Sequence, residues 1–322
     1  MKKGYAAAAV TALLAGAVLA GISFGTELIS PLEAIASLFM EGSLKGEIIL
    51  KLRFPRVVAA LMVGASLSVC GAVFQSVFRN PLADPFITGV SGGAALGYSI
   101  AVIFFPAPGL AMFSAFCGSL FSVLIIFFLS RSAGFTGSIF ILSGVAMSFI
   151  FSSSVMLLFS VARSESVHKT VIWMMGDLNS SGEYLAVLSV IAAGLMIVLW
   201  LFHRHLDILA FGTDFSRSSG VTSLEIRIII VLASTLAALS VALGGIVPFV
   251  GLMVPHFVRF FAGAGNFALI PLSAAAGGAF LVSCDAVSRS VVVPFEIPVG
   301  VITGMTGGIF FLVYVLRSRR EL

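Results

Sequence analysis

The chain has 322 residues, of which 59% are hydrophobic and only 10% are charged, and its formal net charge is +4. A soluble domain carries about 25% charged residues, so a water-soluble fold of this length could not cover its surface with polar side chains. The composition therefore excludes a soluble protein and indicates that lipid surrounds most of the chain. The small positive charge fits loop residues that set membrane topology, and it gives no indication of a nucleic-acid partner.

Long apolar runs favour helices over strands as the membrane-crossing elements. A membrane β-barrel has segments of about ten residues that alternate apolar and polar side chains, whereas runs such as 187–202 and 228–243 are apolar almost throughout. We predict an all-α polytopic membrane protein with about ten transmembrane helices in a single domain, residues 1–322. The expected spans are 5–25, 57–78, 87–105, 110–130, 139–161, 184–202, 226–244, 247–262, 270–284 and 299–316.

The first span decides the expected topology. The chain begins Met1-Lys2-Lys3 and stays apolar to Phe24, which is longer than the apolar core of about 7–15 residues in a signal peptide. We therefore expect an uncleaved first helix with its lysines in the cytoplasm. Ten spans then place both termini in the cytoplasm and the chain in the inner membrane. Two hydrophilic stretches remain, 27–56 outside and 203–227 inside.

Small residues recur within the second span, and two prolines lie between the second and third spans. Gly64, Ser68 and Gly71 recur at helical spacing and predict a stripe against which another helix packs closely. The Asn80-Pro81 and Asp84-Pro85 pairs that follow predict the end of the helix at the cytoplasmic side.

Several ordered motifs carry a family resemblance. They are the runs 53–56 (RFPR), 63–67 (VGASL), 71–75 (GAVFQ), 79–85 (RNPLADP), 89–94 (GVSGGA), 173–176 (WMMG), 245–259 (GIVPFVGLMVPHFVR), 285–289 (DAVSR) and 296–301 (EIPVGV). Together they resemble the FecCD-type permease family, which serves iron-chelate and vitamin B12 ABC importers. The motifs keep the family's order over nearly the whole chain.

The resemblance implies a type II ABC importer permease fold and a set of partners. Two permease copies would pair around a central pathway, as a homodimer or with a sister permease. Two ATPase subunits would dock at the cytoplasmic face, and a periplasmic or lipid-anchored substrate-binding protein would dock outside. The chain has no G-x-x-x-x-G-K-[ST] phosphate loop, so ATP and Mg²⁺ would be used by the partner ATPase. No enzyme activity and no cofactor are expected in this chain.

Arg53 and Arg56 match family positions that meet acidic residues of the binding protein, and Arg289, at the outer end of the ninth span, is expected to have a similar docking role. Exposed arginines suit this role because their planar fork engages carboxylates and their charge steers the encounter. The alternative is anchoring to lipid headgroups.

A gate, a pathway and a coupling segment are implied in the same way. The gate residues are Asn80, Pro81 and Leu82 after the second span and Thr136, Gly137 and Ser138 before the fifth. The fifth span would line the pathway with Ser143, Gly144, Ser148 and Ser152, unless these serines only join helices. The segment that would enter a groove of the ATPase comprises Gly212, Thr213, Asp214, Phe215, Ser216, Arg217 and Gly220.

Alternatives to an importer permease have little support in the sequence. His256 lacks further ligands at metal-binding spacing, so no metal site is expected. An intramembrane serine protease would rest on Ser91 and His256 alone, without a nucleophile motif. An ion-coupled secondary transporter would place ionisable groups in mid-span, and the spans are almost free of them. The cargo is expected to be a metal chelate, with a ferric siderophore ahead of haem and cobalamin.

Overall fold

The computed structural model describes residues 2–25, 29–38, 44–107, 109–132, 137–179, 182–212, 216 and 218–318, and every regular element among them is helical. This confirms the all-α prediction. The elements in chain order are α1 (Lys2–Ser23), α2 (Pro31–Leu38), α3 (Leu44–Ile48), the π-helical turn η1 (Ile49–Arg53), α4 (Phe54–Val77), the 3₁₀ turn η2 (Pro85–Thr88), α5 (Val90–Phe104), α6 (Leu110–Ser132), α7 (Gly137–Val161), α8 (Ser164–Met174), the 3₁₀ turn η3 (Gly182–Tyr184), α9 (Leu185–Leu201), α10 (His203–Ala210), α12 (Ser223–Gly244), α13 (Val250–Ala262), α14 (Asn266–Ser288) and α15 (Val299–Ser318).

Each of the ten predicted apolar runs coincides with one helix. Within the described ranges, six helical stretches are long and apolar enough to cross a membrane: Gly4–Ser23, Leu44–Val77, Leu110–Ser130, Ile139–Val161, Ser223–Gly244 and Asn266–Ser288. Helices α9 and α10 make a seventh candidate, bent by 52° at the break between them. Three further apolar helical stretches are shorter, namely Val90–Phe104 in α5, Val250–Ala262 in α13 and Val299–Tyr314 in α15. With 13 residues, α13 is about 20 Å long and cannot by itself cross a hydrocarbon core of about 30 Å.

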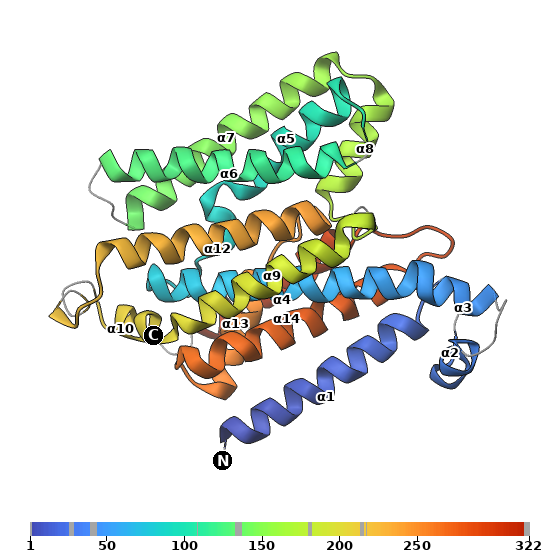
Figure 1. Cartoon of the computed structure of the whole chain (residues 1–322), viewed down its shortest axis with the longest axis horizontal. Helices are drawn as coiled ribbons and strands as arrows, with labels where there is room; N and C mark the ends of the chain where they lie inside the picture. Colours follow the sequence, from blue (N-terminus) through green and yellow to red (C-terminus); the bar gives the residue numbers. More distant parts are fainter. Residues whose placement is uncertain are drawn as a thin grey trace.

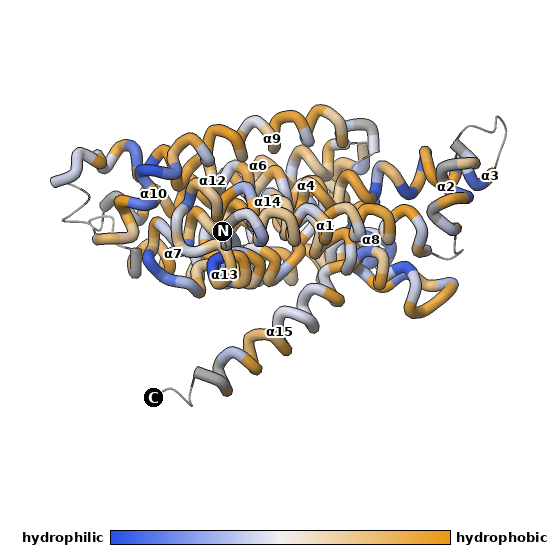
Figure 2. The backbone as a smooth tube through the Cα atoms, turned by 90° about the horizontal axis from the view of Figure 1, so that it is seen from below, coloured by the Kyte–Doolittle hydropathy of each residue, from blue (hydrophilic) through white to orange (hydrophobic). Residues whose placement is uncertain are grey.

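The long helices lie side by side and give the molecule two polar ends. Figure 1 shows α4, α12 and α14 in the middle, with α5, α6 and α7 on one side and α1 on the other. Helices α2 and α3 lie at the right end, whereas α10 and both termini lie in the left half. Figure 2 shows that hydrophilic residues gather near α10 and near α3 and α8, with a mostly hydrophobic centre. We call these the α10 end and the α3 end.

The predicted small-residue stripe of α4 is confirmed. A Cβ at Gly64 would collide with the carbonyl oxygen of Gly277 in α14, and one at Gly71 would collide with the carbonyl oxygen of Gly251 in α13. Ser68 lies against Gly277 as well. Helix α4 is therefore the element on which both α13 and α14 pack. It is buried along most of its length.

Two helices contain an internal proline, and in each a side chain from another helix donates to the carbonyl that the proline leaves without a hydrogen bond. A proline at position i removes the hydrogen bond to the carbonyl of residue i−4. For Pro271 that carbonyl belongs to Phe267, and the indole Nε1 of Trp200 donates to it at 3.0 Å. For Pro255 it belongs to Gly251, toward which Gln75 Nε2 points at 3.4 Å. Helix α14 consequently extends over 266–288, beyond the predicted limits of 270 and 284.

Helix α15 diverges from the body of the molecule, as Figure 2 shows. Its Gly307 packs against the ring of Phe249, a residue that takes the left-handed φ of 67° where α13 begins. Farther along, Tyr314 lies edge-on to His256, with 4.9 Å between ring centroids. Much of its remaining surface is apolar and exposed, as at Met305, where 64% of the residue is accessible.

Candidate functional site

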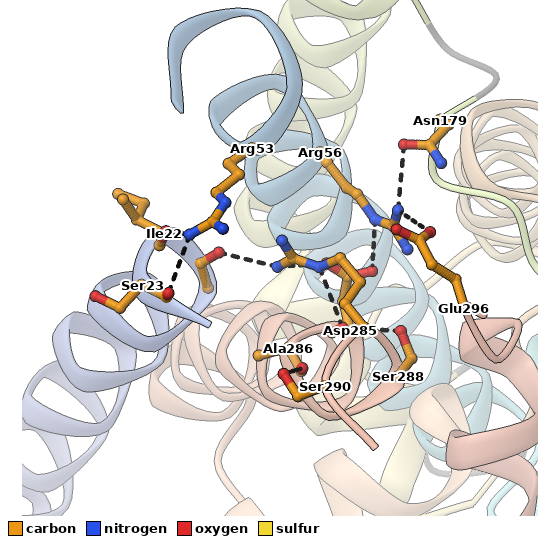
Figure 3. A network of polar contacts seen from close by, with 12 residues as sticks. Ile22, Ser23, Arg53, Arg56, Asn179, Asp285, Ala286, Ser288, Ser290 and Glu296 are labelled. Carbon is orange, nitrogen blue, oxygen red and sulfur yellow. Dashed lines mark hydrogen bonds and ion pairs between the residues drawn. The ribbon is translucent and has the colours of Figure 1, made fainter. Parts of the chain in front are cut away.

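A cluster of charged side chains joins α1, α4 and α14 at the α3 end (Figure 3). Arg56, in the first turn of α4, places its Nε 2.8 Å from Oδ1 of Asp285 and its Nη1 2.6 Å from Oε2 of Glu296. Arg289 Nη2 lies 3.0 Å from the other Asp285 oxygen. Asp285 is completely buried, so its charge is compensated by two guanidinium groups rather than by water. We call Arg53, Arg56, Asp285, Arg289 and Glu296 the arginine cluster.

The end of α1 supplies backbone oxygens to the same cluster. Arg53 Nη1 donates to the carbonyls of Ile22 at 2.7 Å and Ser23 at 3.0 Å, and Arg289 Nη2 donates to Gly21 at 2.9 Å. The last carbonyls of a helix lack intrahelical donors and carry a partial negative charge, which explains why two arginines gather there. The cluster therefore fixes the first helix to the rest of the chain.

The exposure that we expected of all three arginines is wrong for two of them. Arg53 and Arg289 are only 5% and 4% exposed, because each extends across the end of α1. Burial lowers the pKa of Arg289, and the nearby Asp285 charge acts in the opposite direction. The side chain of Arg56 is 11% accessible, whereas its partner Glu296 is 41% accessible. Of the cluster, the Arg56–Glu296 pair is the part that faces solvent, and docking itself stays a prediction.

A strained turn at the α10 end precedes the gate segment, which comprises the predicted gate residues Asn80, Pro81 and Leu82. Helix α4 ends at Val77, and Arg79 takes a left-handed φ of 49°, a conformation that costs a non-glycine residue about 1–2 kcal/mol. The N–H of Asn80 returns to the carbonyl of Gln75 at 3.2 Å, and the Asn80 side chain accepts from the N–H of Leu82 at 2.9 Å. The predicted helix break is thus confirmed.

The gate segment then leads into η2. Asp84 caps this turn by accepting from the N–H of Phe86 at 2.8 Å, and burial raises the pKa of Asp84 to about 6. Pro81 and Leu82 are exposed. In the second predicted part of the gate, Thr136 lies outside the described residues, and Gly137 and Ser138 are the first two residues of α7.

The predicted coupling segment is described at three of its positions. Gly212 and Gly220 both have left-handed φ angles, 116° and 87°, so the chain turns sharply on either side of the segment. Ser216 is 1% exposed, and its hydroxyl donates back to the carbonyls of Gly212 at 2.6 Å and Ile208 at 3.2 Å. The predicted residues Thr213, Asp214, Phe215 and Arg217 lie outside the described part of the chain.

A polar bridge at the α10 end was missed at the sequence level. Oδ1 of Asp207, in α10, accepts from both the backbone and the side-chain N–H of Asn266, each at 2.8 Å. The Asn266 Oδ1 in turn lies 3.0 Å from the hydroxyl of Ser76, in the last turn of α4. These positions are 59 and 190 residues apart, and no local pattern links them. We call Ser76, Asn266 and Asp207 the polar bridge.

The four predicted pathway residues of α7 do not share one environment. Gly144 is buried, and a Cβ there would collide with the carbonyl oxygen of Ile87 in η2. Ser148 donates to the carbonyl of Gly144 at 2.8 Å, Ser143 is half-buried, and Ser152 is exposed. Because positions four apart drift by about 40° around a helix, this row turns from the interior to the surface. Pathway lining stays a prediction.

The sequence predicts that His256 is not a metal ligand. Its ring lies among the aromatic residues Tyr314 and Phe310 of α15. In the described ranges, no group of three or more His, Cys, Asp or Glu side chains could hold a metal ion.

Comparison with known proteins agrees over almost the full length. The FecCD transport family profile matches residues 13–317. The vitamin B12 import system permease protein of Vibrio cholerae is 35% identical, covering 86% of this chain and 85% of its own length. The hemin transport system permease protein of Yersinia pestis is 36% identical, covering 84% of each chain. The Fe(3+)-citrate import system permease protein of Bacillus subtilis is 35% identical, covering 94% and 91%.

A solved structure shares the fold. It is described as an inward-facing conformation of a metal-chelate type ABC transporter, is 28% identical, and aligns with a TM-score of 0.85 over 98% of this chain and 99% of its own. The all-helical architecture is therefore that of a type II ABC importer permease. Given these matches, the chain belongs to the FecCD transport family and is a multi-pass membrane permease subunit of an ABC importer.

Proposed function

We propose that this chain is the translocating subunit of an ATP-driven, binding-protein-dependent importer that carries a metal chelate across the inner membrane. The family match over residues 13–317 carries the proposal. The names of the relatives include vitamin B12, hemin and Fe(3+)-citrate, all of which hold a metal in an organic ligand. A ferric siderophore is the first candidate cargo, followed by haem and cobalamin.

In the proposed orientation, the α3 end faces outward and the α10 end faces the cytoplasm. The predicted coupling segment and the gate segment then lie on the ATPase side, together with both termini. The arginine cluster lies on the side of the binding protein, to which the pair Arg56 and Glu296 presents a partly exposed charge. Docking there would place an acidic group of the binding protein against Arg56, whose fork suits a carboxylate.

A second permease copy is proposed to cover the exposed side of α15. Met305, Ile309 and Leu312 are each more than 60% accessible on a helix that leaves the body of the molecule. In lipid, helices associate through close packing rather than through the hydrophobic effect alone. Pairing of two copies along this helix would enclose a pathway between them.

The test is uptake by the reconstituted importer. The permease, its ATPase and its binding protein would be placed in proteoliposomes, and uptake of cyanocobalamin, haemin, ferric citrate and a ferric hydroxamate siderophore would be measured. We expect one chelate to accumulate only with ATP and to stop accumulating with vanadate. Uptake that continues without ATP and follows an imposed proton or sodium gradient would favour the secondary transporter instead.

A further inference from the structure

We infer that the polar bridge of Ser76, Asn266 and Asp207, together with the proximity of Arg79 to Gly212, transmits movement from the coupling segment to the gate. Under the proposed function, on which this step rests, the coupling segment moves with the ATPase and the gate must respond. The two segments are far apart in sequence, and the bridge joins the helices that carry them. The three bridge residues are thus assigned a positioning role in transport.

The first step joins the coupling segment to α10. Ser216 is buried and returns its hydroxyl to the carbonyls of Ile208 and Gly212. Its backbone N–H also bonds to Gly212 at 2.9 Å. Leu206 and Leu209 anchor α10 in the core, at 0% and 3% exposure. Gly212 and Ser216 are therefore held against α10 at the start of the coupling segment.

The second step joins α10 to α14 and α4. One oxygen of Asp207 accepts two N–H groups of Asn266 at 2.8 Å, one of them a backbone N–H at the beginning of α14. Such first-turn donors have no intrahelical partner, so the carboxylate of another helix acts as the cap. With its NH₂ group turned toward Asp207, the amide of Asn266 directs Oδ1 to the hydroxyl of Ser76, at 3.0 Å.

The third step leads from Ser76 to the gate. Ser76 occupies the last turn of α4, and three residues later Arg79, in its left-handed conformation, directly precedes the predicted gate residues Asn80, Pro81 and Leu82. A Cβ built on Gly212 would lie 3.4 Å from Nη1 of Arg79, so the first residue of the coupling segment lies beside the residue that precedes the gate. A strained backbone conformation persists where the surrounding structure determines it, and Arg79 lies between the end of α4 and Gly212.

The contacts show that these residues lie close together, and energetic coupling between the coupling segment and the gate is tested by substitution. We would replace Asp207 by Ala, which removes the acceptor, and by Asn, which keeps an acceptor oxygen of the same size. Ser76→Ala breaks the far end of the bridge at a residue that is only 6% exposed and therefore out of reach of the ATPase. Each variant would be reconstituted with the ATPase and binding protein, and chelate uptake and ATP hydrolysis would be measured on the same proteoliposomes.

We expect Asp207→Ala and Ser76→Ala to lower the amount of chelate taken up per ATP by about fivefold or more, the lower range of typical coupling between sites. ATP hydrolysis should remain within about twofold of the unaltered complex, and Asp207→Asn should retain most of the uptake. A fluorophore on Leu82→Cys, in a background without the native cysteines, should respond to vanadate-trapped nucleotide in the unaltered protein and not in Asp207→Ala.

The outcomes distinguish failure of the proposed function from failure of the transmission role. If the unaltered complex takes up none of the tested chelates with ATP, the proposed function fails. If it does take one up, and both Asp207→Ala and Ser76→Ala keep their uptake per ATP and their fluorescence response, the transmission role fails. A merely structural role would lower hydrolysis and uptake together through loss of assembled complex, and that result would also overturn the inference.

Discussion

The Nε of Arg56 lies 2.8 Å from a carboxylate oxygen of Asp285 that no water can reach, while Nη1 of the same arginine holds the partly exposed Glu296 at 2.6 Å. One guanidinium thus joins a buried charge to a surface charge. The two carboxylates should consequently differ in what they do. Asp285 holds the fold together, and Glu296 is available to change partners.

Replacing Asp285 by Asn should strongly destabilise the permease. The substitution keeps the volume but leaves Arg56 and Arg289 without their shared counter-charge, and removing one partner of a buried ion pair costs about 3–5 kcal/mol. Glu296→Gln is the matched control, because a partly exposed pair contributes at most about 1 kcal/mol. Unfolding in mixed micelles, followed by tryptophan fluorescence, measures both. Equal stability of the two variants would show that the buried carboxylate is not needed.

Glu296→Gln should also strengthen docking of the binding protein. The glutamate occupies the Arg56 fork that an acidic group of the partner would need, so its removal takes away an internal competitor. We expect binding up to about fivefold tighter, in line with the value of a partly exposed ion pair, with the difference shrinking at high salt. Biolayer interferometry on the permease in nanodiscs measures this affinity.

Glu47→Gln provides the control for the docking experiment. Glu47 also lies at the α3 end, but it pairs with Lys51 at 3.0 Å rather than with the arginine cluster. The variant therefore removes the same charge without freeing Arg56. If Glu296→Gln binds no more tightly than Glu47→Gln, the gain comes from net charge alone and Arg56 has no part in docking.

Asp84 should make the stability of the permease depend on pH. Its folded-state pKa of about 6 is above the ordinary carboxyl value of 3.8, so the folded state binds the proton more tightly than the unfolded state. Stability from this group is therefore present below about pH 4 and is lost as the pH rises through 6. Asp84→Asn, which keeps an oxygen to cap η2, should remove the effect. Melting temperatures of both proteins between pH 4 and 8 should diverge as the pH rises, with the variant higher; curves that stay parallel would contradict the prediction.

The sequence predicts the helices well because their signal is local. Each apolar run forms a helix. In lipid, only a helix or a closed β-barrel provides hydrogen-bond partners for every backbone N–H and C=O group. Gly64 and Gly71 were recognisable as a contact stripe from their spacing alone, and Asn80-Pro81 marked the end of α4. All of these signals come from residues that are close together in the sequence.

The partners of polar side chains were not predictable, because they come from distant parts of the chain. Arg53 was expected to be exposed, yet its acceptors are carbonyls about 30 residues earlier, and no backbone carbonyl carries a sequence signal. Asp207 and Asn266 lie 59 residues apart on helices that the sequence does not orient. The predicted span starts at residue 270, whereas α14 begins at Asn266. The donor that compensates for Pro271, Trp200, belongs to another helix.

That compensation gives the last prediction. Replacing Trp200 by Phe keeps a smaller aromatic ring and removes the N–H that donates to the Phe267 carbonyl at 3.0 Å. Loss of this hydrogen bond should cost about 1 kcal/mol of stability. Pro271→Ala restores a backbone N–H one turn away, so the Phe267 carbonyl regains its ordinary helical donor. In the Pro271→Ala background, Trp200→Phe should therefore cost clearly less than it does alone. The four proteins form a double-mutant cycle whose interaction energy, measured by unfolding in mixed micelles, is expected to exceed about 0.5 kcal/mol. Additive effects would mean that the indole stabilises the helix by packing alone, and that the carbonyl freed by the proline is satisfied without it.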